Sequence, residues 1–203
     1  MNEPNYDAAK MLRAATKPLN IHLSTLVAET GLWAHPEVHK KLFTISGSAA
    51  FFPDRRRART PKGEKRGQHI GNVTLDDNTY ANNAIKRAIG VKPVNLLGFE
   101  ACHIWSDTCY DERYHNAIAN LILLPRALAA LSDYDEEVCS ALRFRSYELY
   151  GWHPDNKPKP NRPESYPEKL AHPTTILARS RASCYAAAQT VGLSFPYYRR
   201  HTR

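Results

Sequence analysis

The sequence lacks any long apolar run. No segment approaches the roughly 18 consecutive apolar residues that a membrane-spanning helix requires. The first seven residues, Met1–Asp7, have neither the basic nor the apolar part of a secretory signal. With 203 residues and 42% hydrophobic content, the chain can still bury one sizeable core. We therefore expect a soluble, cytoplasmic protein without a membrane partner.

Closely spaced cysteines are also lacking. The four cysteines stand at positions 102, 109, 139 and 184 and form no Cys-x-x-Cys pair. This spacing indicates neither a zinc ribbon nor a disulfide framework. We expect most of them to be reduced, half-buried thiols.

Negative charge is scarce. The formal net charge is +8 and the isoelectric point is about 9.4, which favours a polyanionic partner, with nucleic acid as the leading candidate. The charge is concentrated between residues 55 and 66, where seven cations and one glutamate give a local charge of +6. These cations are Arg55, Arg56, Arg57, Arg59, Lys62, Lys65 and Arg66.

Pro61 and Gly63 lie inside this basic segment, which predicts a mobile loop or arm. Such an arm would contact phosphates and add affinity without reading sequence, unless its arginines reach base edges. The alternative is a solvated loop that serves solubility. We prefer the arm.

Periodicity and turn residues predict mixed secondary structure. Helices are expected over 5–16, 20–32 and 80–89, and from Ser132 to the stop at Gly151. Strands are expected over 69–75, 96–105 and 119–124, with a helix opening at Pro125. The proline-rich stretch 154–173 predicts an extended connector, and 174–191 again has helical character. The fold class is therefore α+β, a mainly helical domain around a small β, β, α core.

This order divides the chain into three regions. Residues 1–95 form an N-terminal helical region with the basic arm, and residues 96–153 form the core with its following helix. Residues 154–203 form the connector and a C-terminal helical arm.

The core contains the most informative motif. Its first strand reads Gly-Phe-Glu-Ala-Cys-His-Ile-Trp over 98–105, and its second begins Asn-Leu-Ile-Leu-Leu at Asn120. Together these resemble the HNH, or ββα-metal, endonuclease family in its Glu-Ala-Ala-His-Ile variant. The resemblance implies that His103 is the general base. It also implies that Asn120 either holds the histidine through a backbone carbonyl or binds the metal.

Neutral imidazole can accept a proton from water, and an amide oxygen is a hard ligand suited to Mg²⁺. We therefore expect one divalent cation, Mg²⁺ before Mn²⁺ or Zn²⁺, held near Glu100 and Asn120. The chain departs from the family pattern at the position just before the base. This position is often Asp or His in the family and is Cys102 here. A thiolate there would favour Zn²⁺, whereas an inert thiol would leave the ligand role to Glu100, Asp107 or Asp111.

The second departure lies eight or nine residues after Asn120, where Leu128 and Ala129 replace the family's last His or Asn. Asn120 is then itself a ligand, or another residue substitutes, or the site is degenerate. His115 and Asn116 are alternatives to Asn120.

These features predict a metal-dependent DNA endonuclease. A restriction-type enzyme is favoured, since the remaining residues leave room for DNA-reading and dimer surfaces, and a homodimer would cut both strands of a palindrome. Alternatives are a non-catalytic basic DNA-binding protein, a nicking or phage-type nuclease, and a basic RNase.

Overall fold

The computed structural model describes residues 7–59, 63–90, 96–168 and 170. It confirms the expected α+β class: helices surround two small sheets. The two strands β4 (Phe99–His103) and β5 (Leu121–Pro125) form an antiparallel hairpin, with His103 opposite Leu121 and Glu100 opposite Leu124. The short helices α6 (Arg126–Ala129) and α7 (Leu131–Tyr134) follow β5, so the β, β, α order is confirmed.

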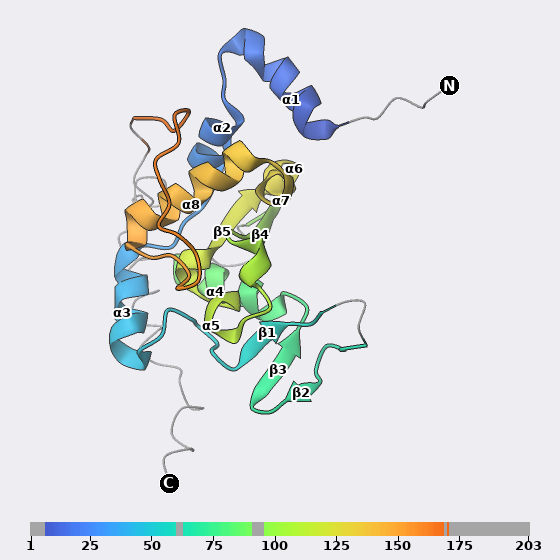
Figure 1. Cartoon of the computed structure of the whole chain (residues 1–203), viewed down its shortest axis with the longest axis vertical. Helices are drawn as coiled ribbons and strands as arrows, with labels where there is room; N and C mark the ends of the chain where they lie inside the picture. The colour runs from blue at the N-terminus through green and yellow to red at the C-terminus, as the bar shows by residue number, and fades with distance from the viewer. Residues whose placement is uncertain (1–6, 60–62, 91–95, 169, 171–203) are drawn as a thin grey trace.

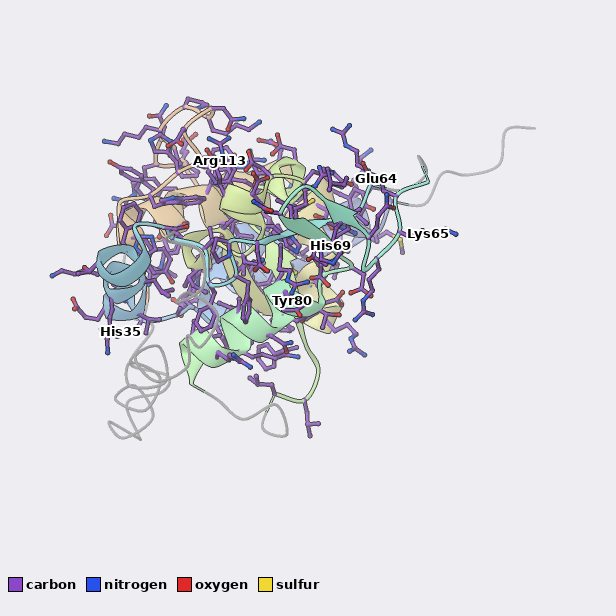
Figure 2. The ribbon with its side chains drawn as sticks, turned by 90° about the horizontal axis from the view of Figure 1, so that it is seen from below. His35, Glu64, Lys65, His69, Tyr80 and Arg113 are labelled. Carbon is purple, nitrogen blue, oxygen red and sulfur yellow. The ribbon has the colours of Figure 1, made fainter. Side chains whose placement is uncertain are left out.

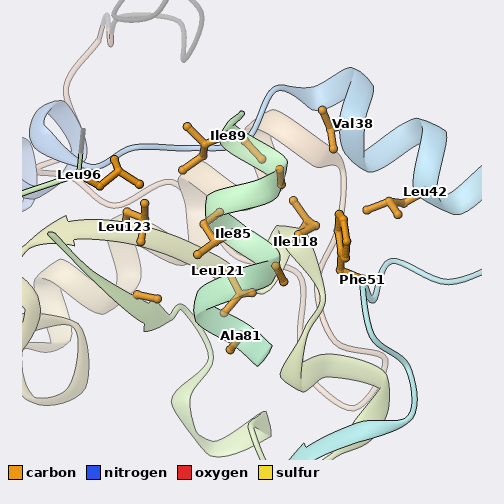
Figure 3. Close-up of a cluster of buried hydrophobic side chains, with 14 residues drawn as sticks. Val38, Leu42, Phe51, Ala81, Ile85, Ile89, Leu96, Ile118, Leu121 and Leu123 are labelled. Carbon is orange, nitrogen blue, oxygen red and sulfur yellow. The ribbon is translucent and has the colours of Figure 1, made fainter. Parts of the chain in front are cut away.

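The hairpin separates two apolar clusters because successive strand residues point to opposite faces. On one face, Ala101, Leu121 and Leu123 pack in the cluster that contains α4 (Thr79–Ile89). Figure 3 shows Ile85 and Ile89 of this helix over the hairpin, with Val38, Leu42 and Phe51 completing the layer. The other face carries Cys102, Ile122 and Leu124.

That second face is covered by α2 (Leu23–Thr30) and α8 (Glu136–Tyr150), which lie beside the hairpin in Figure 1. The helix α8 begins where the Asp135 carboxylate accepts the Val138 N–H, and it ends at Gly151, whose φ of +63° suits glycine. The expected helix before Gly151 is confirmed at its end, but it begins at Glu136 rather than Ser132, because residues 131–134 form the separate helix α7. Because α2 comes from the N-terminal region and α8 from the core region, the two regions share one apolar cluster.

The N-terminal region contains one helix more than expected. The helices α1 (Ala8–Thr16) and α2 confirm the prediction, and the 3-10 turn η1 (Lys17–Leu19) joins them. The helix α3 (Pro36–Ser46) was not predicted. Pro36 occupies the first turn of α3, where a missing N–H costs nothing, and His35 caps it.

The prediction of a mobile arm is wrong for its first part. The segment Arg55–Arg57 is strand β1, which pairs in parallel with β3 (Val73–Asp76), while β2 (His69–Ile70) pairs with the other edge of β3. Two of the three cations of β1 are held by packing partners: the Arg55 guanidinium lies 4.2 Å from the Tyr80 ring centroid, and Arg56 pairs with Glu64 at 3.5 Å. Lys62 lies outside the described residues.

The connection between the two hairpin strands is ordered as short helical turns. These are η3 (Ser106–Thr108), α5 (Glu112–His115) and η4 (Ile118–Asn120). After α8, residues 154–168 contain no helix or strand, as the proline content predicts, although Tyr166 is buried against Phe144. The predicted helix over 174–191 lies outside the described residues.

Within the described residues, no helix has the length and apolar character needed to cross a membrane.

The buried histidine of α3 makes stability depend on pH. His39 is 7% exposed, its ring centroid lies 5.2 Å from that of Tyr150, and burial lowers its pKa from 6.5 to about 4. Above pH 6.5 the folded and unfolded chains both hold a neutral imidazole. As the pH falls from 6.5 toward 4, only the unfolded chain takes up the proton, so stability is lost.

We expect protonation of His39 in the unfolded chain to lower the free energy of unfolding by about 2 kcal/mol between pH 7.5 and pH 5. Urea unfolding of wild type and His39→Phe at both pH values measures it, because the variant should lose less stability on acidification. His22→Phe, at a side chain 60% exposed, is the control. An equal loss in wild type and His39→Phe would contradict the assignment.

Candidate active site

His103 is the last residue of β4 and is 5% exposed. Its Nε2 lies 3.0 Å from the backbone carbonyl oxygen of His115, and the two imidazole rings stack with centroids 5.2 Å apart. A carbonyl oxygen can only accept, so Nε2 carries the hydrogen and donates it. The other ring nitrogen, Nδ1, is then the one with a free electron pair.

Its surroundings keep His103 neutral. Burial, together with the charges of His115 and Arg57, lowers the pKa of His103 from 6.5 to about 3. The imidazole is therefore unprotonated at pH 7, as a general base must be, although it is a weak base in the free protein. A bound phosphate would add negative charge beside the ring and raise this pKa. The site is thus suited to work on an anionic substrate.

Asn120 is fully buried just before β5 and braces the connection. Its Oδ1 accepts the Trp105 N–H at 2.9 Å, and its Nδ2 donates to Thr108 Oγ1 and to the Tyr114 carbonyl oxygen, both at 3.0 Å. Tyr114 immediately precedes the residue whose carbonyl holds His103. This geometry favours the bracing role for Asn120 over the metal-ligand role, since its amide is enclosed and both its ends are engaged.

The alternatives to Asn120 occupy other positions. Asn116 donates to the Phe52 carbonyl oxygen at 2.9 Å and so ties the connection to the chain before β1. Leu128 and Ala129, where the family places its last ligand, lie on α6. The Ala129 carbonyl oxygen is 3.8 Å from Cys102 Sγ, so this helix does pack over the residue that precedes the base.

Cys102 is an inert thiol. Burial raises its pKa to about 11, and its Sγ donates to the carbonyl oxygens of Glu100 and Ala129 at 3.8 Å. The thiolate that binds Zn²⁺ is thus a negligible fraction at neutral pH. Of the two alternatives for this position, the structure favours the one in which carboxylates hold the metal.

We expect Cys102→Ser to retain Mg²⁺-dependent cleavage within about threefold, because the hydroxyl can donate to the same carbonyls. Initial rates of DNA cleavage at saturating Mg²⁺ measure this. Thiol labelling at pH 8 provides a second reading, since about 0.1% of the native Cys102 should be thiolate. A hundredfold loss of cleavage, or loss of bound Zn²⁺, would instead make the thiolate a ligand.

The carboxylates of the connection are already engaged. Asp111 accepts from the Arg113 backbone and pairs with its guanidinium at 2.6 Å, and Asp107 pairs with Lys157. Glu100 is more open: its side chain is 54% exposed, and Arg126 is 3.9 Å away. Glu100 therefore remains the metal-ligand candidate that the sequence suggested.

Sequence reasoning missed Asp133, at the exposed side of α7. Burial raises its pKa and the negative charge of Glu100 raises it further, while Arg57 lowers it. The charges of both carboxylates also act on Cys102. The negative charge of Glu100 disfavours ionisation of Asp133, and a divalent cation bound by both carboxylates would offset that repulsion, with water or phosphate oxygens completing its shell. In the described residues, no group of three or more His, Cys, Asp and Glu is arranged to hold a metal by itself.

The basic residues divide into two kinds. Arg55 and Arg56 are half-buried, with guanidiniums held by Asp54 and Tyr80 and by Glu64. Arg57 is exposed, and in the described part of the chain its side chain makes one long hydrogen bond, 3.9 Å to Cys109 Sγ. Its charge acts on both His103 and Asp133. Arg57 is thus the cation of the basic segment that lies at the candidate site.

Two further described cations of the segment also have partners. Arg59 stacks on Tyr110 with its guanidinium carbon 5.4 Å from the ring centroid, and Arg66 pairs with Asp77 at 2.9 Å. Figure 2 shows Glu64 and Lys65 toward one side of the molecule, His69 nearer its centre, and His35 on the opposite side.

Comparisons of this chain with protein-family models, with curated proteins and with solved structures found no match.

Proposed function

We propose that the protein is a metal-dependent DNA endonuclease of the ββα-metal type, of restriction type, acting in the cytoplasm. The observation that carries this proposal is the setting of His103. A neutral imidazole is held at the end of a hairpin strand by a backbone carbonyl, within the field of an exposed arginine. That combination suits removal of a proton from water beside a phosphate.

In the proposed mechanism, His103 Nδ1 takes a proton from the attacking water. Arg57 binds the phosphate oxygens and opposes the charge that develops on them. A divalent cation, held by Glu100 and Asp133, would stabilise the same charge and the leaving oxygen. Asn120 keeps the connection in place, so that the carbonyl that holds His103 stays fixed.

The sheet of β1, β3 and β2 provides the proposed DNA-binding surface. All residues from 65 to 72 are exposed, and they include Lys65 and Arg66 but no carboxylate. In the described residues β2 is an edge strand, because it pairs with β3 alone. A cationic two-stranded ribbon of this kind fits against a duplex and its groove.

A homodimer belongs to the same proposal. In α1 and the following turn, Met11 and Leu19 are 60% and 67% exposed, and no residue of α1 is buried. Apolar surface of this kind supports association of two copies, which would place two sites on a palindromic duplex. Sedimentation of the protein with and without DNA tests the stoichiometry.

Plasmid and genomic DNA, incubated with the protein and Mg²⁺, Mn²⁺, Zn²⁺ or EDTA, test the function. The proposal predicts discrete fragments that require a divalent metal and whose ends map to one sequence. Conversion of plasmid to the open circle without linearisation would indicate a nickase. Cutting of a matched RNA in preference to DNA would indicate an RNase.

The second candidate is a DNA-binding protein without catalysis. It is favoured by the absence, in the described residues, of a complete group of metal-ligating side chains. This candidate predicts DNA binding that is independent of divalent metal, with no cleavage under any metal. Gel-shift assays in EDTA, run beside the cleavage assay, separate the two candidates.

Arg57 and Arg55 give a matched pair of variants. We expect Arg57→Ala to weaken DNA binding, to reduce the slope of log K against log salt by about 1, and to slow cleavage at saturating DNA. Arg55→Ala should instead lower the melting temperature, because its guanidinium packs on Tyr80 and pairs with Asp54. Equal salt slopes for Arg57→Ala and wild type would remove Arg57 from the interface.

A further inference from the structure

Three buried titratable side chains from different segments form a row, and the candidate base His103 is one of them. They are His103 at the end of β4, His115 at the end of α5 and Asp76 at the end of β3, and they are 5%, 0% and 2% exposed. Burying a charged group is costly unless it is paired. A row of this composition therefore depends on contacts among its own members.

Each contact in the row fixes the next side chain. The Asp76 carboxylate accepts the Tyr80 N–H at 2.8 Å, at the first turn of α4, and its Oδ2 lies 3.4 Å from His115 Nε2. The His115 ring stacks on the His103 ring at an interplanar angle of 21°, and the His115 carbonyl accepts from His103 Nε2. Asp76 thus orients the His115 ring, and that ring stacks on the His103 ring and holds its plane. The backbone carbonyl of His115 sets the tautomer of His103.

We propose that Asp76 and His115 are positioning residues that keep His103 in its Nε2–H tautomer, with Nδ1 turned to the proton that it removes. This inference rests on the proposed function, in which His103 activates water. It assigns a role to a carboxylate that lies 39 positions from His115 and in a different sheet from His103.

The electrostatic surroundings of the row lower the pKa of His103. His103 faces His115 on α5 and Arg57 on β1, and both charges disfavour a proton on His103. His115 in turn faces Asp76, whose pKa is lowered to about 2: burial opposes ionisation, but hydrogen bonds from His115 and from the Tyr80 and Asp77 backbone outweigh it. Asp76 is therefore ionised at any working pH and can accept the hydrogen bond that orients the His115 ring.

The test uses the full-length protein as wild type, Asp76→Asn, Asp76→Glu and a control, Asp77→Asn. Asp77 is the exposed neighbour, which caps Thr79 and pairs with Arg66 without touching His115. Long-range ¹⁵N–¹H spectra of the imidazoles report the tautomer of His103 without any need for activity. We expect the Nε2–H form in wild type and Asp77→Asn, a tautomer mixture in Asp76→Asn, and partial recovery in Asp76→Glu.

Cleavage gives the second readout. Asp76→Asn should lower kcat roughly tenfold with KM for DNA unchanged, because the His103 ring is then held less firmly in the orientation that removes the proton. A variant that only melts at lower temperature, with the wild-type tautomer and kcat, would overturn the proposal. So would an Nδ1–H tautomer in wild type, which needs no folded variant. Absence of cleavage in wild type would refute the nuclease and leave the tautomer result standing.

Discussion

Replacing His103 by alanine is expected to abolish DNA cleavage and to leave DNA binding nearly unchanged. The imidazole supplies the general base, a contribution worth about 10²- to 10⁴-fold in rate. Binding depends instead on cations such as Arg57, which the substitution does not touch. Single-turnover cleavage rates and gel-shift affinities, measured on the same preparations, separate the two effects.

His22→Ala is the matched control, because His22 has a side chain 60% exposed and lies in the N-terminal region. Circular dichroism of each variant checks that the loss is not unfolding, since His103 is buried and donates a hydrogen bond. His103→Ala protein that is folded, binds DNA and cuts at the wild-type rate would exclude His103 as the base.

Asn120→Ala is expected to cause the largest loss of stability. The substitution removes three hydrogen bonds in a fully buried place and leaves the Trp105 N–H without its acceptor. The Thr108 hydroxyl still donates to the Trp105 carbonyl, and the Tyr114 carbonyl still accepts from the Ala117 N–H. An unsatisfied buried group costs about 1–3 kcal/mol and each further lost hydrogen bond about 1 kcal/mol, so we expect a loss of about 3–5 kcal/mol in the free energy of unfolding. Urea unfolding with a common m-value measures the loss.

Asn82→Ala provides the comparison, because Asn82 makes one side-chain hydrogen bond, to the Asn78 carbonyl within α4. The free energy of unfolding of Asn82→Ala should fall by no more than about 1 kcal/mol. Should Asn120→Ala prove as stable as Asn82→Ala, Asn120 would not brace the connection, and the metal-ligand alternative would regain support.

The local part of the site could be predicted from the sequence. The apolar residues 121–124 with Pro125 indicated a buried strand followed by a helix, and Gly151 indicated the end of α8. These features depend on neighbours in sequence. The same pattern placed His103 and Asn120 in the two hairpin strands, although the first strand ends at His103 and Asn120 comes just before the second.

The non-local part could not be predicted. Asp76 contacts a histidine 39 positions away, and Arg57 contacts Cys109, 52 positions away. No pattern along the chain states which loop packs on which strand. The density of positive charge at 55–57 argued for solvent, but a guanidinium can stack on an aromatic face and pair with a carboxylate, as Arg55 does. Charge alone therefore did not separate a strand from an arm.

The central claim, metal-dependent hydrolysis of DNA, is tested most directly by the cleavage rate of a labelled duplex as Mg²⁺ is titrated into wild-type protein from EDTA. The substrate carries a site mapped from genomic cleavage, and an RNA duplex of the same sequence runs in parallel. We predict no cleavage in EDTA, a saturable rise with Mg²⁺, and little cleavage of RNA. A duplex that is bound but stays intact with Mg²⁺, Mn²⁺ and Zn²⁺ would contradict the account and favour a DNA-binding protein without catalysis.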